Sequence, residues 1–451
     1  MSYYAKRLIV VLLFVLLMVI PLVIMLLAPQ PAARQLWRDA GVAMGFLGLG
    51  MMGWQFVSPV RLRFLTEIIE LDALYNVHHR LSRLSFFLVL AHPLILIIGN
   101  PYNFVAFNIF SGVWKLIAGV VAFVLMLLLV YTSIWREWLR LSYEAWHVLH
   151  DVLAAAVLAF ALYHIFNVGY FTAQPLQRIL WIVYGIVWFA MIVYVRLITP
   201  LRLTQHPWEL VEIIEERANT WTLAFAPVGH AGMEFRAGQT AWLIIDDSAF
   251  GYESHPFSFS SSALQPERVE FAIRELGDWT SQVNEYPLGT RAYIDGPYGT
   301  FDLDHHPGSE YTFVAGGIGS APIMSMLRTL AETNDDRPLR FFYGNKTWEG
   351  IAFREELERL EQILNLEVIH VLEEAPEDWE GETGFISADV MGRYIADCSS
   401  CIYFICGPIP MINFVTAELQ KLEVPRDQVT LGPRQLVRPP GRVFVEQYEM
   451  A

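Results

Sequence analysis

The sequence predicts a multi-domain protein in which a six-helix transmembrane bundle is followed by an antiparallel β-barrel and a doubly wound α/β domain. Three observations support this prediction. The first 200 residues contain six long apolar stretches, short alternating runs separated by Gly and Pro turns begin at residue 208, and strands alternate with helices after residue 311. We expect the three domains at residues 1–202, 203–306 and 307–451.

The charge is divided unevenly along the chain. Residues 1–200 contain 13 Lys and Arg against 7 Asp and Glu, whereas the remainder contains 18 against 39, within a net charge of −15. A mildly basic apolar half joined to an acidic half is typical of a membrane domain followed by a water-soluble one. Such acidity argues against a nucleic-acid partner. The three cysteines all lie in the acidic half, which fits a reducing compartment without disulfides.

The apolar stretches are long enough to span a bilayer. We expect the spans at residues 8–27, 41–57, 78–98, 112–134, 147–167 and 178–198. The first run is too long for the apolar core of a typical signal peptide, so we interpret it as a helix.

Basic residues near the span ends predict the orientation. If the spans alternate, one side carries Lys6, Arg7, Arg61, Arg63, Arg136, Arg140, Arg196 and Arg202, and the other Arg34, Arg38, Lys115 and Arg178. The richer side is cytoplasmic. Both termini and everything after Thr199 are therefore expected in the cytoplasm.

Four histidines form two matched pairs within the spans. His78 and His92 are 14 residues apart, and so are His150 and His164. That spacing returns to within about 40° of the same helix face with ~21 Å of rise. Two helices that each present imidazoles at two depths can hold two stacked metal centres. Imidazole on both sides of an iron is haem ligation, and the sequence has no CxxCH motif for covalent attachment.

Neighbouring histidines fit this arrangement less well. His79 lies 13 residues before His92, a rotation of about 220°, and His147 lies 17 before His164, about 100° out of line. A single membrane histidine is usually a hydrogen-bonded packing residue, but two matched pairs favour ligands. We therefore expect His78 with His150 near the cytoplasmic face, and the other pair nearer the outer face.

The acidic half contains patterns suited to a flat ring and to phosphates. His255, Pro256, Phe257 and Ser258 begin a run in which aromatics that can pack on a ring alternate with hydroxyls, although an ordinary serine-rich strand remains an alternative. Further on, Arg274 precedes a turn opened by Gly277. Its charge and free backbone N–H groups suit a pyrophosphate.

Two Gly-rich segments follow. Residues 295–299 read as a tight closing turn, DGPYG. Gly316, Gly317 and Gly319 then end a strand and open a helix at Pro322, where the chain can approach a phosphate closely. The CxxC at residues 398–401 stands alone, and we interpret its cysteines as ordinary ones.

Together these residues resemble a known family. HPFSFSSS, IRELGDWT, DGPYGT, VAGGIGSAP and CGP occur in the order found in the ferredoxin-reductase-like module of NADPH oxidases and ferric reductases. The four membrane histidines resemble the haem ligands of the ferric-reductase transmembrane domain. The resemblance implies two b-type haems, FAD in the barrel, and NADPH or NADH on the parallel sheet.

The resemblance also implies roles for single residues. The flavin motif matches His255–Ser258. The flavin-phosphate contacts match Arg274, Gly277 and Thr280. The nicotinamide-nucleotide loop matches Gly316, Gly317, Gly319 and Pro322, and the strand end beside the nicotinamide matches Cys406, Gly407 and Pro408. In the tail, Tyr448 takes the place of the family's flavin-covering Phe. The expected catalytic positions are therefore Tyr448, which would cover the flavin, and Cys406, at the strand end beside the nicotinamide.

We therefore expect a transmembrane oxidoreductase of the bacterial inner membrane that passes electrons from cytoplasmic NAD(P)H through FAD and two haems to an outer acceptor. Short outer loops favour oxygen, giving superoxide, and reduction of a ferric or cupric chelate is the alternative. A haem-binding membrane scaffold with a docking domain is a third possibility. Asn345-Lys346 lies just beyond the second strand of the parallel sheet, where the lysine could meet the 2′-phosphate of NADPH or be a solvated loop residue. The sequence therefore does not decide between NADPH and NADH. The expected partners are membrane lipid and the small-molecule acceptor, with no obligate protein partner.

Overall fold

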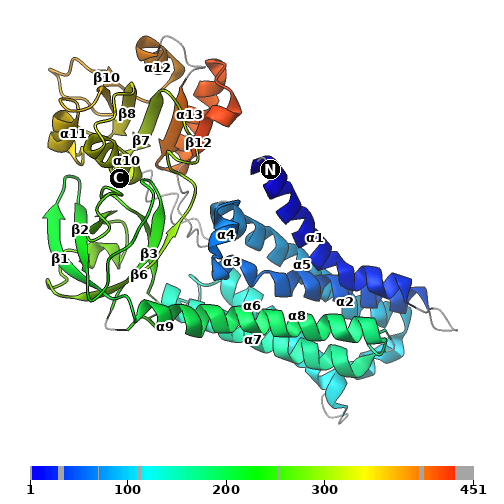
Figure 1. Cartoon of the computed structure of the whole chain (residues 1–451). Helices are drawn as coiled ribbons and strands as arrows, with labels where there is room; N and C mark the ends of the chain where they lie inside the picture. Colours follow the sequence, from blue (N-terminus) through cyan, green and yellow to red (C-terminus); the bar gives the residue numbers. More distant parts are fainter. Residues whose placement is uncertain are drawn as a thin grey trace. The chain divides into compact units, whose positions relative to one another are not determined.

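The computed structural model describes residues 3–28, 35–69, 71–108, 113–169, 171–246, 248–251, 253–395 and 401–431 (Figure 1). The chain divides into two compact units, the first ending at Thr199 and the second beginning at Pro200. The domain boundaries at 202/203 and 306/307 stay predictions.

The first unit is helical. Its elements are α1 (Tyr3–Leu27), α2 (Leu36–Trp54), α3 (Val57–Val60), α4 (Arg63–Thr66), α5 (Leu71–Gly99), η1 (Pro101–Phe107), α6 (Trp114–Ile134), α7 (Tyr143–Val168), α8 (Pro175–Val193) and the π-helical turn η3 (Tyr194–Ile198), which α9 (Thr199–Leu203) follows. Among the described residues, six helices are long and apolar enough to cross a membrane, which confirms the six-helix prediction.

The helices extend beyond the predicted spans because their polar ends are helical too. The fifth was expected from residue 147, but α7 begins at Tyr143. Ser142 caps it, since its hydroxyl accepts the N–H of Ala145 at 3.2 Å. The third was expected from residue 78, but α5 begins at Leu71. The helices pack most extensively in two pairs, α5 against α2 and α7 against α6.

The second unit begins with a barrel, green in Figure 1. Its elements are β1 (Trp208–Glu215), β2 (Thr220–Pro227), β3 (Thr240–Ile245), β4 (His255–Ser258), β5 (Val269–Arg274), the short helix η4 (Thr280–Gln282) and β6 (Arg291–Tyr298). The strands are antiparallel in the order β4-β3-β6-β1-β2-β5. A bridge between Phe259 and Phe271 joins the two outer strands and closes the barrel around an apolar core.

One local prediction was wrong. Asp295 to Tyr298, expected as a closing turn, form the end of β6. Pairing with β3 overrides the Gly-Pro turn signal, and the ladder accommodates it by a register shift between Thr240 and Trp242.

The rest of the second unit is a parallel sheet. Its elements are β7 (Tyr311–Gly316), η5 (Gly317–Gly319), α10 (Ser320–Glu332), β8 (Leu339–Asn345), α11 (Arg354–Leu360), β9 (Leu366–Leu372), β10 (Glu382–Thr383), α12 (Ala388–Tyr394), β11 (Ile402–Cys406), α13 (Ile409–Lys421), η6 (Arg426–Gln428) and β12 (Val429–Leu431). The strand order is β10-β9-β8-β7-β11-β12. One core packs α10 and α11 on the sheet and another packs α12 and α13, which confirms the doubly wound prediction.

Candidate functional site

The structure brings the four predicted histidines together in two pairs. His78 on α5 faces His150 on α7 with ring centres 6.5 Å apart, and His92 faces His164 with ring centres 6.4 Å apart. A metal–imidazole bond is about 2.0 Å long, so two imidazoles that share one ion have ring centres ~6 Å apart. Both pairs therefore have the separation that a shared metal requires.

Hydrogen bonds fix His92 and His164, the pair expected nearer the outer face, in the form that can bind a metal. Nδ1 of His92 lies 2.8 Å from the carbonyl oxygen of Gly41, and Nδ1 of His164 lies 2.7 Å from that of Lys115. A carbonyl oxygen can only accept, so each Nδ1 carries the hydrogen and each Nε2 keeps its lone pair. Ligating histidines are commonly oriented in this way.

The inner pair is arranged in a related way. Nδ1 of His150 lies 3.2 Å from the hydroxyl of Ser133, which donates its hydrogen to the carbonyl of Leu129 at 2.7 Å. The Ser133 oxygen therefore accepts from His150, whose Nε2 is again free for a metal. Nδ1 of His78 is buried without a hydrogen-bond partner in the part of the chain that the structure describes.

Two glycines that the sequence analysis missed make room for the outer pair. A Cβ on Gly45 of α2 would lie 2.9 Å from Nδ1 of His92, and one on Gly119 of α6 would lie 2.5 Å from Nδ1 of His164. Each glycine comes four residues after the carbonyl that its histidine binds. The missing side chains let the rings reach these carbonyls. The GxxxG spacing in the second span was the available signal.

His147, excluded above by its spacing, is engaged elsewhere. Its Nε2 accepts a hydrogen bond from Arg196 on η3 at 3.3 Å, and Arg196 also forms an ion pair with Asp151. The residues that the structure describes contain no group of three or more His, Cys, Asp or Glu that could hold a metal ion. Two protein ligands per centre suit an iron whose remaining ligands come from a macrocycle.

The predicted flavin motif forms β4 at the edge of the barrel sheet, paired with β3 from Thr240↔Ser258 to Leu243↔His255. The rings of His255 and Phe257 both stack on Trp279. Their ring centres lie 4.2 Å and 5.7 Å, respectively, from that of Trp279. The aromatic surface expected from the flavin motif therefore also includes Trp279, which the sequence analysis assigned to the phosphate turn.

The phosphate turn differs from its prediction in one respect. The hydroxyl of Thr280 accepts the N–H groups of Leu276 and Gly277 at 2.8 and 2.9 Å, so these donors close the turn rather than remain free. Arg274 lies at the end of β5. A Cβ on Gly317 would lie 3.1 Å from its Nη1, so a barrel cation meets the nucleotide loop.

The predicted nicotinamide-nucleotide loop lies where the strand order reverses, between β7 and β11. A Cβ on Gly319 would lie 2.3 Å from the carbonyl oxygen of Cys406, and one on Gly316 would lie 2.5 Å from the sulfur of Met411. Only glycine permits this approach of the two strand ends. The loop before Pro322 thus meets the Cys406-Gly407-Pro408 segment, and a positively charged, Cβ-free cradle of this kind fits a dinucleotide.

Cys406 is buried, and burial raises the pKa of its thiol to about 12. Below its pKa a thiol is protonated, and at pH 8 a thiol of this kind is ionised in about one molecule in ten thousand. Only the thiolate is a nucleophile. The side chain therefore offers a neutral sulfur beside the loop.

We expect iodoacetamide at pH 8 to leave Cys406 unmodified in the folded protein and to alkylate it after denaturation. Peptide mass spectrometry on both samples checks this. Modification of the folded protein at a rate typical of a free thiol would contradict the burial of this sulfur.

Tyr448 with the rest of the tail, and Cys398, lie outside the described residues. Lys346 is paired with Glu374 at 3.4 Å, and both side chains are more than half exposed. An exposed ion pair of this kind contributes little, so it does not withhold Lys346 from a 2′-phosphate.

Comparison with known families finds three matches in the order of the domains. Residues 44–161 match the ferric reductase like transmembrane component, residues 201–302 an FAD-binding domain, and residues 313–417 the oxidoreductase NAD-binding domain. The first match includes His78, His92 and His150 and ends three residues before His164.

Curated relatives match the second half. The propane 2-monooxygenase reductase component of Rhodococcus jostii is 30% identical over 218 residues, covering 46% of this chain and 58% of the relative. NADH-cytochrome b5 reductase 1 of Kluyveromyces lactis is 28% identical, covering 39% and 61%. Sulfhydrogenase 2 subunit gamma of Pyrococcus furiosus is 32% identical, covering 41% and 67%. The chain spans about three fifths of the length of the first two of these relatives.

Solved structures give similar matches. The flavohemoglobin from Malassezia yamatoensis aligns with a TM-score of 0.48 at 16% identity, covering 87% of this chain and 96% of that one. The ferredoxin reductase in carbazole 1,9a-dioxygenase aligns with a TM-score of 0.44 at 21% identity, covering 50% and 68%.

Proposed function

The chain belongs to the family that joins a ferric-reductase-like transmembrane component to FAD-binding and NAD-binding domains, and on this premise we propose that it carries electrons across a membrane. Membership makes it an integral membrane enzyme that oxidises a reduced nicotinamide with FAD. The enzyme prediction is thereby confirmed over the scaffold alternative. The proposed route runs from cytoplasmic NAD(P)H through FAD and two b-type haems to an acceptor on the outer side of a bacterial inner membrane.

The observation that carries this proposal is the geometry of the four membrane histidines. Each pair would hold one haem, His78 with His150 and His92 with His164. In both pairs the ring centres have the separation that two imidazoles sharing one metal ion require. Three of the four have their tautomers set so that Nε2 is available. FAD supplies the conversion of a two-electron hydride donor into single electrons, which iron exchanges reversibly.

The residues of the second unit bind and orient the nucleotides. His255, Phe257 and Trp279 offer stacked rings to the flavin. The glycines of the loop after β7 admit the pyrophosphate, with Arg274 supplying positive charge beside Gly317. The buried Cys406 keeps a neutral, apolar surface at the strand end, so water and a competing charge are excluded there.

We propose oxygen as the acceptor. The segments that join α1 to α2, α5 to α6 and α7 to α8 would lie outside in the predicted orientation. They cover residues 28–35, 100–113 and 169–174 and offer few groups to hold a metal chelate. With one imidazole from each histidine of a pair, a haem would keep no open ligand position, so the acceptor would take electrons at the haem edge. One NAD(P)H reduces two oxygen molecules, giving NAD(P)⁺, one proton and two superoxide ions. Reduction of a ferric or cupric chelate is the second candidate.

A purified-protein assay tests the acceptor. We expect cytochrome c to be reduced during NAD(P)H oxidation, and superoxide dismutase to abolish most of that reduction. A ferric chelate serves as the parallel acceptor, with NADH and NADPH compared in each case. Chelate reduction that is faster than oxygen consumption and insensitive to the dismutase would assign the protein to the second candidate.

A further inference from the structure

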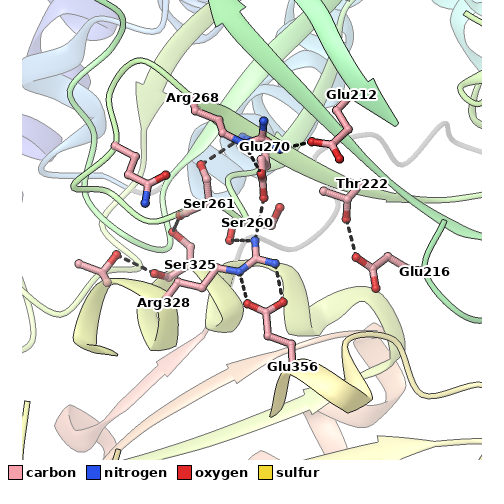
Figure 2. Close-up of polar contacts among 12 residues, drawn as sticks. Glu212, Glu216, Thr222, Ser260, Ser261, Arg268, Glu270, Ser325, Arg328 and Glu356 are labelled. Carbon is pink, nitrogen blue, oxygen red and sulfur yellow. Dashed lines mark hydrogen bonds and ion pairs between the residues drawn. The ribbon is translucent and has the colours of Figure 1, made fainter. Parts of the chain in front are cut away.

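One face of α10 holds the loop that follows the flavin strand (Figure 2). Ser325 donates its hydroxyl hydrogen to the carbonyl of Ser261 at 2.6 Å, and Nη1 of Arg328 donates to the carbonyl of Ser260 at 2.7 Å. One residue further, the hydroxyl of Thr329 accepts the N–H of Ala263 at 2.9 Å. Positions i, i+3 and i+4 lie on one helix face, so a single surface of α10 binds the main chain of residues 260–263 at three points.

Arg328 also joins α10 to α11 and to β5 through its charge. Its Nε and Nη2 form two parallel bonds of 2.7 Å to the carboxylate of Glu356 on α11, and Nη1 lies 2.9 Å from Glu270 on β5. The side chains of Arg328, Glu356 and Glu270 are 18%, 24% and 12% exposed, respectively. A bidentate arginine pair fixes direction as well as distance, because the guanidinium is planar. Arg268 binds the other oxygen of Glu270 at 2.8 Å and completes the network in Figure 2.

Both ends of these contacts reach the nucleotide sites. Helix α10 begins at Ser320, directly after the nicotinamide-nucleotide loop, and its residues from Ser320 to Leu327 are all buried. The bound loop begins two residues after the flavin motif His255–Ser258. The contacts on this face of α10 therefore link the N-terminus of the helix to the segment that follows the flavin strand.

Hydride transfer is sensitive to a displacement of one nucleotide relative to the other. Donor and acceptor atoms must approach to about 3–3.5 Å, and a misplacement of ~1 Å from a remote change can lower the rate about 100-fold. The nicotinamide loop belongs to the parallel sheet and the flavin strand to the barrel. Their register therefore depends on contacts between these two parts.

We propose that Arg328, with Ser325 and Thr329, is a positioning group that sets the register between the bound nicotinamide and the flavin. None of these three residues belongs to the predicted nucleotide-binding set, and the group acts through the main chain of residues 260–263 and the N-terminus of α10. This inference rests on the FAD-binding and NAD-binding domains and is independent of the haem assignment.

Two variants of the full-length protein test it. In Arg328→Met/Glu356→Gln both charges of the bidentate pair are removed together, while Glu270 retains Arg268 and Glu216 retains the hydrogen bond from Thr222. In Ser325→Ala/Thr329→Val the hydroxyl contacts are lost and all charges are kept. The control is Arg217→Gln, because the pair Arg217–Glu355 also joins the barrel to α11 but is 37% and 58% exposed. Exposed pairs of this kind contribute little.

The measurements are FAD content, the limiting rate of anaerobic flavin reduction by NADH and NADPH, the nucleotide concentration at half that rate, and the flavin–nicotinamide charge-transfer absorbance. We expect normal FAD content and a half-saturation within about twofold of the parent protein. The limiting rate should fall about tenfold or more in the charge variant and severalfold in the hydroxyl variant, with weaker charge-transfer absorbance in both. Arg217→Gln should match the parent protein.

Two results would overturn the proposal. One is an unchanged limiting rate in both variants when FAD is fully bound. The other is a rate that falls only in proportion to FAD lost, which would assign the network to stability alone. Because flavin reduction precedes any electron transfer to the membrane unit, failure of the haem proposal would leave these measurements unaffected.

Discussion

Alanine in place of His92 or of His164 is expected to remove about half of the bound haem and to leave FAD in place. The two histidines face each other with ring centres 6.4 Å apart, and the other pair lies about 21 Å of helix rise away along α5 and α7. Loss of one imidazole therefore affects one centre. FAD is retained because the second unit has apolar cores of its own. Haem content from the pyridine derivative and flavin absorbance of the same sample measure both quantities.

The matched controls are His79→Ala and His147→Ala. His79 neighbours a predicted ligand in sequence, and His147 lies on the same helix as two of them with its Nε2 bound by Arg196. Both variants should keep near-normal haem content. Loss of both haems in His79→Ala, with none lost from His92→Ala, would overturn the ligand assignment.

The histidine pairs could be predicted because their signal is periodic and local. Fourteen residues return to one face of any α-helix, and α5 and α7 keep that face toward each other through the whole span. The nucleotide loop was predictable for a similar reason. A glycine run between a strand and a helix specifies a turn locally, and the parallel strand order then places it beside Cys406.

The supporting contacts could not be predicted because they join residues that are distant in sequence. The carbonyl of Gly41 is 51 positions from His92, and Arg328 is 58 positions from Glu270. No spacing rule connects such pairs before the helices and strands are packed. The prediction of a turn at the Gly-Pro segment of β6 was wrong for the opposite reason. Its local turn signal was clear, but pairing with β3 decided its conformation.

The second large effect is expected for Gly119→Ala. The new Cβ would lie 2.5 Å from Nδ1 of His164 and 2.7 Å from its Cε1, closer than atoms in proteins approach. The ring must then leave the carbonyl of Lys115, which now holds it at 2.7 Å. Losing such an orienting contact typically lowers metal affinity about 10- to 100-fold. Gly45→Ala should act in the same direction on His92 but less strongly, since its Cβ would lie 2.9 Å from Nδ1.

The higher helix propensity of alanine acts against this loss, so the control must make the same Gly-to-Ala change away from the histidines. Glycine to alanine within a helix ordinarily stabilises it by about 1 kcal/mol. Gly185→Ala makes the same change in α8, where the Cβ would meet, among the described residues, only the end of the Leu162 side chain at 3.2 Å. We expect Gly185→Ala to keep both haems, and Gly119→Ala to lose the outer haem or to shift its midpoint potential in a redox titration, with the inner haem unchanged. Equal haem content and equal potentials in the two variants would show that the approach of His164 to α6 does not hold a haem ligand in place.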